Sequence, residues 1–188
     1  CGTMNNGEVR IIGGQWKRSK LPVGKLPGLR PTPDRVRETL FNWLGQDLTG
    51  WHCTDPFAGS GALGFEAASR GAASVFLSDA STECVAALQK AKDRLDAAQL
   101  RIQRSDGLAV LRQLPAGSQD LVFLDPPYDY PHHELALKLA RQCLKPEGLV
   151  YLEADKAWRD DVLGPLGWTL SRHLKAGSVH AHLLQAGA

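Results

Sequence analysis

The sequence predicts an α/β fold built on a mostly parallel seven-stranded β-sheet. Apolar strand-like segments alternate with amphipathic helical segments, and a glycine-rich loop follows the first of these strands. This alternation is typical of a parallel sheet with helices on both faces. The last two strand-like segments are separated only by Ala176-Gly177, which favours a hairpin and therefore an antiparallel last strand. A chain of 188 residues fits one globular domain of ordinary size.

The N-terminal segment differs from the rest of the chain. Residues 8–30 contain a short strand-like run, then Gly13-Gly14 and a basic stretch interrupted by proline and glycine, which predicts a hairpin-like appendage. Residues 31–188 would form the globular domain. A helix is expected to open at Thr32-Pro33-Asp34, which supplies a capping hydroxyl, a proline for the first helical position and an early acid.

The other elements follow from hydrophobic periodicity. Strands are expected at residues 51–55, 74–79, 101–104, 119–124, 148–153, 168–175 and 178–185. Helices are expected at residues 62–70, 81–97, 107–114 and 131–144. Ligands of such sheets bind outside the carboxyl ends of the strands, where the strand order reverses. The residues that end the strands are therefore the first candidates for function.

Composition and charge narrow the classes of function. Hydrophobic residues make up 43% and charged residues 22%, as in soluble globular proteins, and we expect a cytoplasmic protein because neither a membrane-spanning segment nor a secretory signal is evident. The net charge of +2 is uneven, since residues 1–37 carry +6 and the remainder −4. This favours a polyanionic partner near the N-terminus, although a solvated basic loop is the alternative. The candidate contacts are Arg10, Lys17, Arg18, Lys20, Arg30, Arg35 and Arg37.

Cysteine and histidine spacing does not indicate a metal site. Cys53, Cys84 and Cys143 are far apart in sequence and are expected in the apolar core. The pairs His132-His133 and His180 with His182 are interpreted as packed or solvated side chains. We therefore expect no metal.

Acidic residues end four successive strand segments, namely Asp55, Asp79, Asp106 and Asp125. Four carboxylates at one edge of a sheet repel one another unless a cation or hydrogen-bond donors lie among them. A cationic or donor-rich ligand is therefore expected.

The loop after the first strand predicts a nucleotide-like cofactor. Gly59, Gly61 and Gly64 match G-x-G-x-x-G, and Asp79 follows Gly59 by 20 residues, where a ribose-binding acid is expected. Dinucleotides and S-adenosylmethionine both fit this pattern, but Asp55 would repel a pyrophosphate and attract an ammonium or sulfonium group. A turn acid before a proline is the simpler alternative for Asp55. The candidate cofactor-binding residues are Asp55, Phe57, Gly59, Ser60, Gly61, Asp79, Ala80, Asp106 and Gly107.

Asp106 has two compatible interpretations. Its carboxylate could accept a hydrogen bond from an adenine amino group, or it could cap the helix expected from residue 107.

The tetrapeptide Asp125-Pro126-Pro127-Tyr128 ends an apolar strand with a stiff corner, because proline fixes its own backbone and cannot extend a central strand. An exocyclic amine of a base is a poor nucleophile. Hydrogen bonds to the Asp125 carboxylate and the Pro126 carbonyl could rehybridise and aim it. Tyr128 could stack on an extruded base for roughly 1–3 kcal/mol, and Asp125 or water could take the leaving proton. The alternative is an ordinary proline-rich turn.

These motifs together resemble the RsmD family, the 16S ribosomal RNA guanine-N2 methyltransferases. Besides the glycine loop and the tetrapeptide, the resemblance rests on Arg10 to Gly14, on Arg30-Pro31-Thr32 and on Asp34 to Glu38 with Leu40-Phe41-Asn42. It implies a class I, Rossmann-like methyltransferase fold that uses S-adenosylmethionine and releases S-adenosylhomocysteine. A monomer is the default expectation. The implied substrate is one guanine of 16S rRNA in the small (30S) ribosomal subunit, with the basic appendage docking the RNA. Ala80-Ser81 departs from relatives that often carry a second acid there.

Three other functions remain open on the residues alone. Methylation of DNA at adenine N6 or cytosine N4 would suit the same tetrapeptide, although no separate target-recognition domain is evident, and only the resemblance selects guanine. A dinucleotide-dependent oxidoreductase would suit the glycine loop but not Asp55. An RNA-binding module without catalysis would suit the basic N-terminus.

Overall fold

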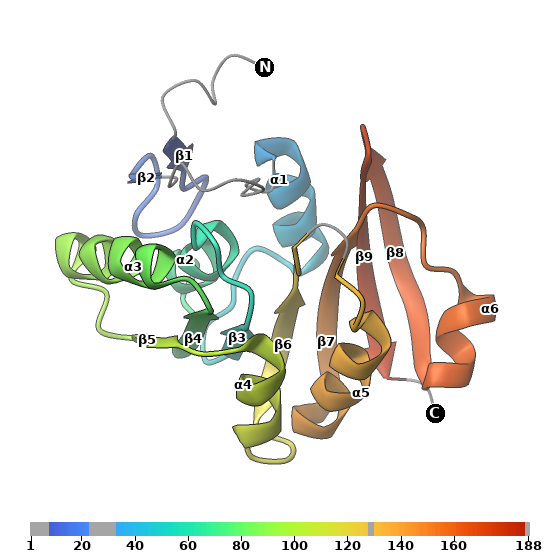
Figure 1. The fold of residues 1–188 in the computed structure, drawn as a ribbon. Helices are drawn as coiled ribbons and strands as arrows, with labels where there is room; N and C mark the ends of the chain where they lie inside the picture. The colour runs from blue at the N-terminus through green and yellow to red at the C-terminus, as the bar shows by residue number, and fades with distance from the viewer. Residues whose placement is uncertain (1–7, 23–32, 128–129, 187–188) are drawn as a thin grey trace.

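A seven-stranded sheet with helices on both faces forms the body of the protein in a computed structural model that describes residues 8–22, 33–127 and 130–186 (Figure 1). The strand order is β5-β4-β3-β6-β7-β9-β8. Neighbours from β5 to β7 are parallel, whereas β9 is antiparallel to both β7 and β8. The predicted fold class, with its antiparallel end, is confirmed.

The strands lie close to their predicted positions. They are β3 (His52–Asp55), β4 (Ser74–Asp79), β5 (Leu100–Arg104), β6 (Gln119–Leu124), β7 (Leu144–Ala154), β8 (Trp168–Ala176) and β9 (Val179–Ala186). The largest difference is β7, which begins at Leu144 rather than at residue 148. Its pairing with β6 is irregular between Gln119 and Leu121. This extension contains Pro146, and proline lacks the N–H that a regular ladder needs, so local sequence does not favour a strand there.

The helices also follow the predicted order. They are α1 (Asp34–Trp43), α2 (Ala62–Ser69), α3 (Thr82–Leu95), α4 (Gly107–Gln113) and α5 (His133–Cys143), followed by the short α6 (Asp160–Leu163) and the 3-10 turn η2 (Gly164–Leu166). The last two were not predicted, because four and three residues are too few to show helical periodicity. Pro33 is the N-cap of α1 rather than its first helical residue, so that prediction is wrong by one position.

Each face of the sheet has its own apolar layer. On one face, α1, α2 and α3 contribute Phe41, Phe65 and Leu88, which are all buried. On the other face, α4 and α5 contribute Leu108 and Leu137. Burial of such side chains is the main favourable term in folding. The three cysteines are buried free thiols, as expected. Within the described ranges, no helix has the length and apolar character needed to cross a membrane.

The N-terminal hairpin shares this core. Strands β1 (Glu8–Arg10) and β2 (Lys20–Pro22) pair antiparallel, which confirms a hairpin in this segment. Ile11 and Leu21 are fully buried in the same apolar cluster as α1, α2 and α3. The hairpin is therefore packed against the body of the protein.

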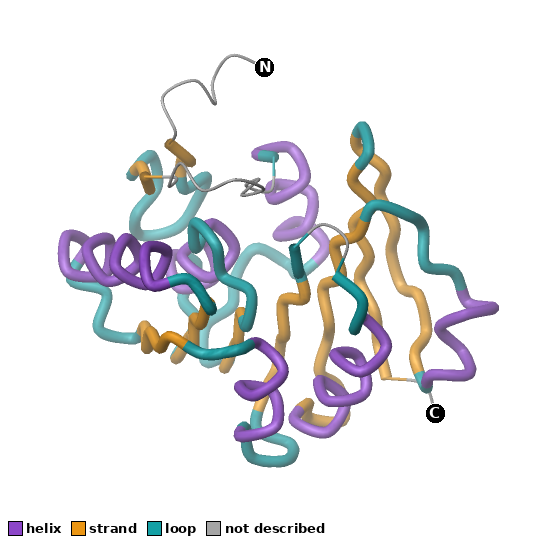
Figure 2. The backbone as a smooth tube through the Cα atoms, viewed as in Figure 1, coloured by secondary structure: helices purple, strands orange, loops and turns teal. Residues whose placement is uncertain are grey.

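The sheet has one point at which its strand order reverses. The chain proceeds outward from β3 through β4 to β5 and then returns to β6 on the other side of β3. Ligands of open α/β sheets bind outside the carboxyl ends of the strands at such a point. The turn joining β8 and β9 lies on the same side of the sheet, because His180 pairs with Ala154 at the end of β7 (Figure 2). Asp55 ends β3 and Asp125 directly follows β6, so both residues lie at the reversal point between these two strands.

Candidate active site

The glycine loop connects β3 to α2 at the reversal point. Gly61 is the N-cap of α2 with a φ of 83°, a conformation that favours glycine. A Cβ atom on Gly64 would lie 2.1 Å from Leu77 Cδ2, so this glycine allows α2 to pack closely against β4. The glycine spacing therefore serves both a tight turn and close packing of the helix on the strand.

Asp79 holds the loop in place from the neighbouring strand β4. Its Oδ2 accepts a hydrogen bond from the Gly59 backbone N–H at 2.9 Å, and its Oδ1 accepts one from the Ser81 N–H at 2.9 Å. Each carboxylate oxygen retains a lone pair for a further donor, such as a ribose hydroxyl. Ser60 also stays within the loop, because its Oγ accepts from the Ala62 N–H at 3.3 Å.

Asp106 caps α4, which confirms one of its two interpretations. Its Oδ2 accepts from the Ala109 N–H at 3.2 Å, while the residue remains exposed. A Cβ atom on the adjacent Gly107 would lie 2.6 Å from the Phe57 ring. Phe57 in turn meets the Tyr130 ring edge to face, with centroids 5.2 Å apart. Around Gly107, the predicted cofactor site therefore consists of the paired Phe57 and Tyr130 rings beside the Asp106 carboxylate that caps α4.

Asp55 is the most strongly perturbed carboxyl group in this region. It ends β3, is 1% exposed, and its Oδ1 has no hydrogen-bond partner among the residues that the structure describes. Burial raises the pKa of Asp55 to about 8, with Asp79 and Glu153 adding to the rise and the Phe57 N–H opposing it. An unpartnered buried carboxyl group is costly unless a donor or cation reaches it. This observation fits a ligand with an ammonium group.

Replacing Asp55 by Asn is expected to separate stability from ligand binding. The folded protein keeps a proton on Asp55 up to about pH 8, whereas an unfolded Asp loses it near pH 4. The contribution of Asp55 to stability is therefore complete below about pH 4 and declines as the pH rises toward 8. Asn cannot ionise, so the Tm of the variant relative to the unmodified protein should rise by several degrees between pH 5 and pH 8.

The same variant should bind S-adenosylmethionine at least about 100-fold more weakly at pH 8, because the buried counter-charge is missing. Thermal scans across this pH range and calorimetric titration measure the two effects. Asp93→Asn on the exposed face of α3 is the matched control. Equal donor affinity in Asp55→Asn would remove this residue from the cofactor site.

The predicted catalytic corner follows β6, the neighbour of β3. Asp125 and Pro126 are partly exposed and Pro127 is exposed, so the corner is accessible, whereas Tyr128 lies outside the described residues. The Pro127 carbonyl accepts a hydrogen bond from the Tyr130 N–H at 3.1 Å. Cys53 and Thr54 of β3 pair with Leu121 and Val122 of β6, and this pairing places Asp55 and Asp125 on adjacent strands at the same edge.

Tyr130 is a site residue that the sequence did not reveal. Its ring lies between Phe57 and His133, and its buried hydroxyl has no partner within the described part of the chain. Burial raises the pKa of Tyr130, and the Asp106 carboxylate adds to the effect. Tyr130 therefore connects the corner to the Phe57 end of the predicted cofactor site.

Glu153 is a second residue that was missed. It ends the parallel part of the sheet at β7 and accepts a hydrogen bond from the Tyr151 hydroxyl at 2.7 Å. The rule that selected the four aspartates, a carboxylate at the end of a strand, also applies to Glu153. It could therefore have been found from the sequence.

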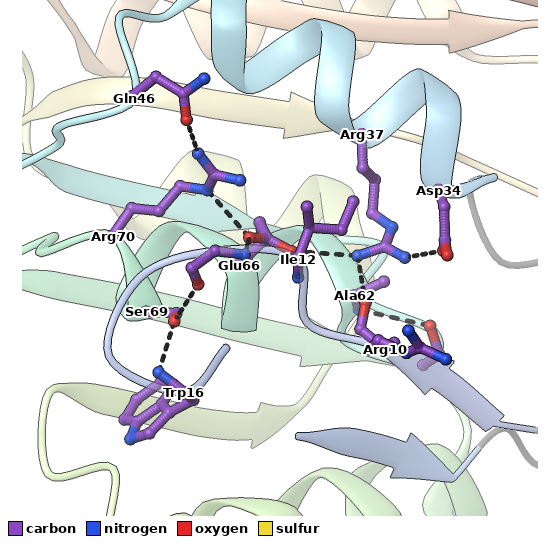
Figure 3. Close-up of polar contacts among 12 residues, drawn as sticks. Arg10, Ile12, Trp16, Asp34, Arg37, Gln46, Ala62, Glu66, Ser69 and Arg70 are labelled. Carbon is purple, nitrogen blue, oxygen red and sulfur yellow. Dashed lines mark hydrogen bonds and ion pairs between the residues drawn. The ribbon is translucent and has the colours of Figure 1, made fainter. Parts of the chain in front are cut away.

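The N-terminal signature, Arg10 to Gly14, docks on α2 through a buried ionic network (Figure 3). Glu66, which is fully buried, accepts hydrogen bonds from the backbone N–H groups of Ile12 and Gly13, each at 2.9 Å. It also accepts from Arg37 at 3.1 Å and from Arg70 at 2.9 Å. The carboxylate thus joins the N-terminal segment and α1 to the helix that follows the glycine loop.

The prediction that Arg37 contacts a polyanion is wrong. Its side chain is 0% exposed, and its guanidinium group binds Glu66, Asp34 and the Arg10 carbonyl. The sequence shows the charge of Arg37 but not its burial. The other described candidates are exposed, namely Arg10, Lys17, Arg18, Lys20 and Arg35, and Arg30 lies outside the described residues.

A family comparison and two similar proteins place this arrangement among known proteins. Residues 9–185 match the profile of the family described as conserved hypothetical protein 95. The chain is 41% identical to "Ribosomal RNA small subunit methyltransferase D" of Escherichia coli (strain K12) over 97% of this chain and 92% of the relative. The Haemophilus influenzae protein of the same name is also 41% identical, over 95% and 94% of the two chains.

The fold agrees with a solved structure. The Escherichia coli protein yhhF superposes with a TM-score of 0.83 at 42% identity, and the match covers 97% of this chain and 99% of that chain. The family match and the two named relatives each span nearly the whole length of the sequence. The chain therefore belongs to the conserved hypothetical protein 95 family, which is the RsmD family that its motifs resemble.

Proposed function

We propose that this protein transfers a methyl group from S-adenosylmethionine to the exocyclic N2 of a guanine in the RNA of the small ribosomal subunit. The observation that supports this most is the position of the buried Asp55, whose Oδ1 has no hydrogen-bond partner among the described residues, beside the Asp125-Pro126-Pro127 corner at the reversal point of the sheet. The names of the two relatives, which are 41% identical, supply the class of RNA.

The residues at the reversal point fit S-adenosylmethionine along its length. Asp55 would attract the ammonium end, because its buried Oδ1 has no hydrogen-bond partner in the part of the chain that the structure describes. Asp79 would accept from the ribose hydroxyls with its remaining lone pairs. Asp106 would accept from the adenine amino group, and Phe57 would pack against the adenine ring beside Gly107. When bound, the cofactor supplies a methyl carbon made electrophilic by the positive sulfonium.

The Asp125 corner would prepare the accepting amine. The Asp125 carboxylate and the Pro126 carbonyl would accept hydrogen bonds from the two N2 protons and so aim the nitrogen lone pair. A bond then forms between N2 and the methyl carbon while the carbon–sulfur bond breaks, and the electron pair of that bond remains on sulfur. The proton that N2 loses would pass to Asp125 or to water. Tyr128 would stack on the extruded base.

The small ribosomal subunit in the cytoplasm is the proposed partner. Exposed basic residues of the N-terminal hairpin would contact phosphates, which carry the negative charge of RNA. The hairpin would not act as a free arm, because the Glu66 network and the buried Ile11 and Leu21 fix it to the body of the protein.

Mass spectrometry of RNA tests the proposed function. Undermethylated small subunits are incubated with the protein and S-adenosylmethionine, and the digested RNA is examined for a methyl group. A single N2-methylguanine in the small-subunit RNA is the expected product. Methylation of DNA adenine N6 or cytosine N4 instead, or calorimetric binding of NAD(H) without S-adenosylmethionine binding, would contradict the proposal. The DNA alternative gains no support from the named relatives.

Removing two charges from the hairpin should weaken particle binding. In Lys17→Gln/Arg18→Asn, the salt dependence of log K should fall by up to about 0.7–0.9 per lost phosphate contact. Asn is chosen at residue 18 because Arg18 has a φ of 74° and Asn tolerates that conformation. Binding to small subunits is titrated at several salt concentrations. Arg112→Gln/Lys138→Gln on α4 and α5 is the control, and an equal salt slope in both variants would show that the hairpin charges face solvent.

A further inference from the structure

Two acidic residues occupy neighbouring positions at the edge of the sheet where the target base is proposed to bind. Strands β6 and β7 are neighbours in the sheet (Figure 1) and run parallel, and Leu124 of β6 pairs with Leu152 of β7. Asp125 and Glu153 are the next residues along the two strands. Since adjacent strands are about 4.8 Å apart, both carboxylates can contact one planar ligand.

The Tyr151 side chain fixes the position of the Glu153 carboxylate through a hydrogen bond. Its ring is fully buried against Phe123, and its hydroxyl donates to Glu153 Oε1 at 2.7 Å. Burial raises the pKa of Tyr151 well above its usual value, and the Glu153 and Asp125 carboxylates add to the rise, so the hydroxyl stays protonated and can donate to Glu153. Each carboxylate oxygen has two lone pairs, so Glu153 has the capacity to accept from a ligand as well as from Tyr151.

The arrangement of donors differs among the nucleic-acid bases. Guanine presents N1–H and the N2 amine at adjacent positions of its Watson–Crick edge. Adenine and cytosine each present an amine beside a ring nitrogen that is an acceptor, and uracil presents a single N–H between two carbonyl oxygens. Two neighbouring carboxylates therefore fit guanine, and they would repel the acceptor nitrogen of adenine or cytosine.

We propose that Asp125 and Glu153 form a subsite for the Watson–Crick edge of guanine, in which Asp125 holds the N2 amine and Glu153 accepts from N1–H. Glu153 is the specificity-determining residue of this pair. The inference rests on the proposed function and adds a structural reason for the choice of base. It assigns a role to an acid that neither the glycine loop nor the proline corner includes.

The test compares guanine with 2-aminopurine at the target position of reconstituted small subunits. This analogue keeps the N2 amine, but its N1 is an acceptor. The unmodified protein should prefer guanine by roughly 10- to 100-fold in kcat/KM. In Glu153→Gln, Oε1 still accepts from Tyr151, and the amide nitrogen that replaces the other oxygen can donate to N1 of 2-aminopurine but cannot accept from guanine N1–H, so the preference for guanine should shrink to about threefold or less. Any contact with guanine O6 affects both proteins equally and cancels in this comparison.

Several readouts separate this role from a structural one. The Gln Oε1 atom can still accept from Tyr151, so the variant should keep its Tm and its affinity for S-adenosylmethionine. Glu147→Gln, an exposed acid near the other end of β7, is the matched control and should leave the preference unchanged. An undiminished preference for guanine in Glu153→Gln would overturn the proposal. A loss of cofactor affinity comparable to that of Asp55→Asn would also overturn it, because Glu153 would then serve the donor.

A folding defect in Glu153→Gln would not hide the answer. Glu153→Asp keeps the charge on a side chain one methylene shorter, and under the proposal it lowers kcat/KM for guanine while it retains the bias against 2-aminopurine. Loss of that bias in Glu153→Asp would count against the proposal. If the unmodified protein methylates no guanine in small subunits, the proposed function itself fails, and this result is distinct from an unchanged preference in the variant.

Discussion

Replacing Asp125 by Asn is expected to lower the rate of methyl transfer to small-subunit RNA by about 10³-fold. Asn keeps the size of the side chain but loses the negative charge that would polarise the amine and accept its proton. The backbone corner should persist, because Pro126 and Pro127 set its geometry and the Tyr130 N–H still binds the Pro127 carbonyl. The effect should therefore appear in kcat, with little change in the affinity for cofactor or RNA.

Single-turnover methyl incorporation measures this rate, and separate titrations measure the two affinities. Asp161→Asn, an exposed acid at the start of α6, serves as the control. Turnover equal to that of the unmodified protein would exclude Asp125 from the chemistry. A variant that lost cofactor or RNA affinity in proportion to its rate would instead assign Asp125 to binding.

Replacing Glu66 by Gln is expected to destabilise the protein by about 3–5 kcal/mol. The Glu66 carboxylate is 0% exposed and accepts from two backbone N–H groups and from the guanidinium groups of Arg37 and Arg70. A neutral amide leaves two buried cations with less counter-charge and turns one acceptor into a donor that faces other donors. The cost should be far larger than that of removing a surface carboxylate.

Chemical denaturation measures the free energy of unfolding of this variant. Glu38→Gln on the exposed face of α1 should change it by less than about 0.5 kcal/mol, which provides the comparison. Because Glu66 also holds Ile12 and Gly13, hydrogen exchange of the N-terminal hairpin should accelerate more than that of β6. If Glu66→Gln lowered the free energy of unfolding by less than about 1 kcal/mol, other interactions would be compensating for the lost ionic network.

The N-terminal signature is explained by contacts that are distant in sequence. Gly14 has a φ of 79°, and a Cβ atom there would lie 2.0 Å from the Ser69 carbonyl oxygen. The Ser69 hydroxyl donates to the Gly13 carbonyl at 2.6 Å and accepts from the Trp16 N–H at 2.9 Å. The close docking of this segment on α2 therefore explains the two glycines.

The sequence by itself determined the elements and the acids that end them. Hydrophobic periodicity and turn residues act over a few positions, so β3, β4, β6 and the glycine loop could be placed from local patterns. The same local chemistry indicated Asp106 as a helix cap and Asp55, Asp79 and Asp125 as strand-end carboxylates. The parallel sheet then followed, because consecutive strands with a helix between them must run in the same direction.

Only the tertiary structure decided which side chains meet and which are buried. Arg37 and Arg35 are both basic residues of one helix, yet Arg37 is buried against Glu66, 29 positions away, whereas Arg35 is exposed. The role proposed for Glu153 depends on the pairing of β7 with β6, which places this residue beside Asp125. Burial and pairing depend on contacts between segments far apart in the chain. A residue's charge and its immediate neighbours therefore cannot specify them.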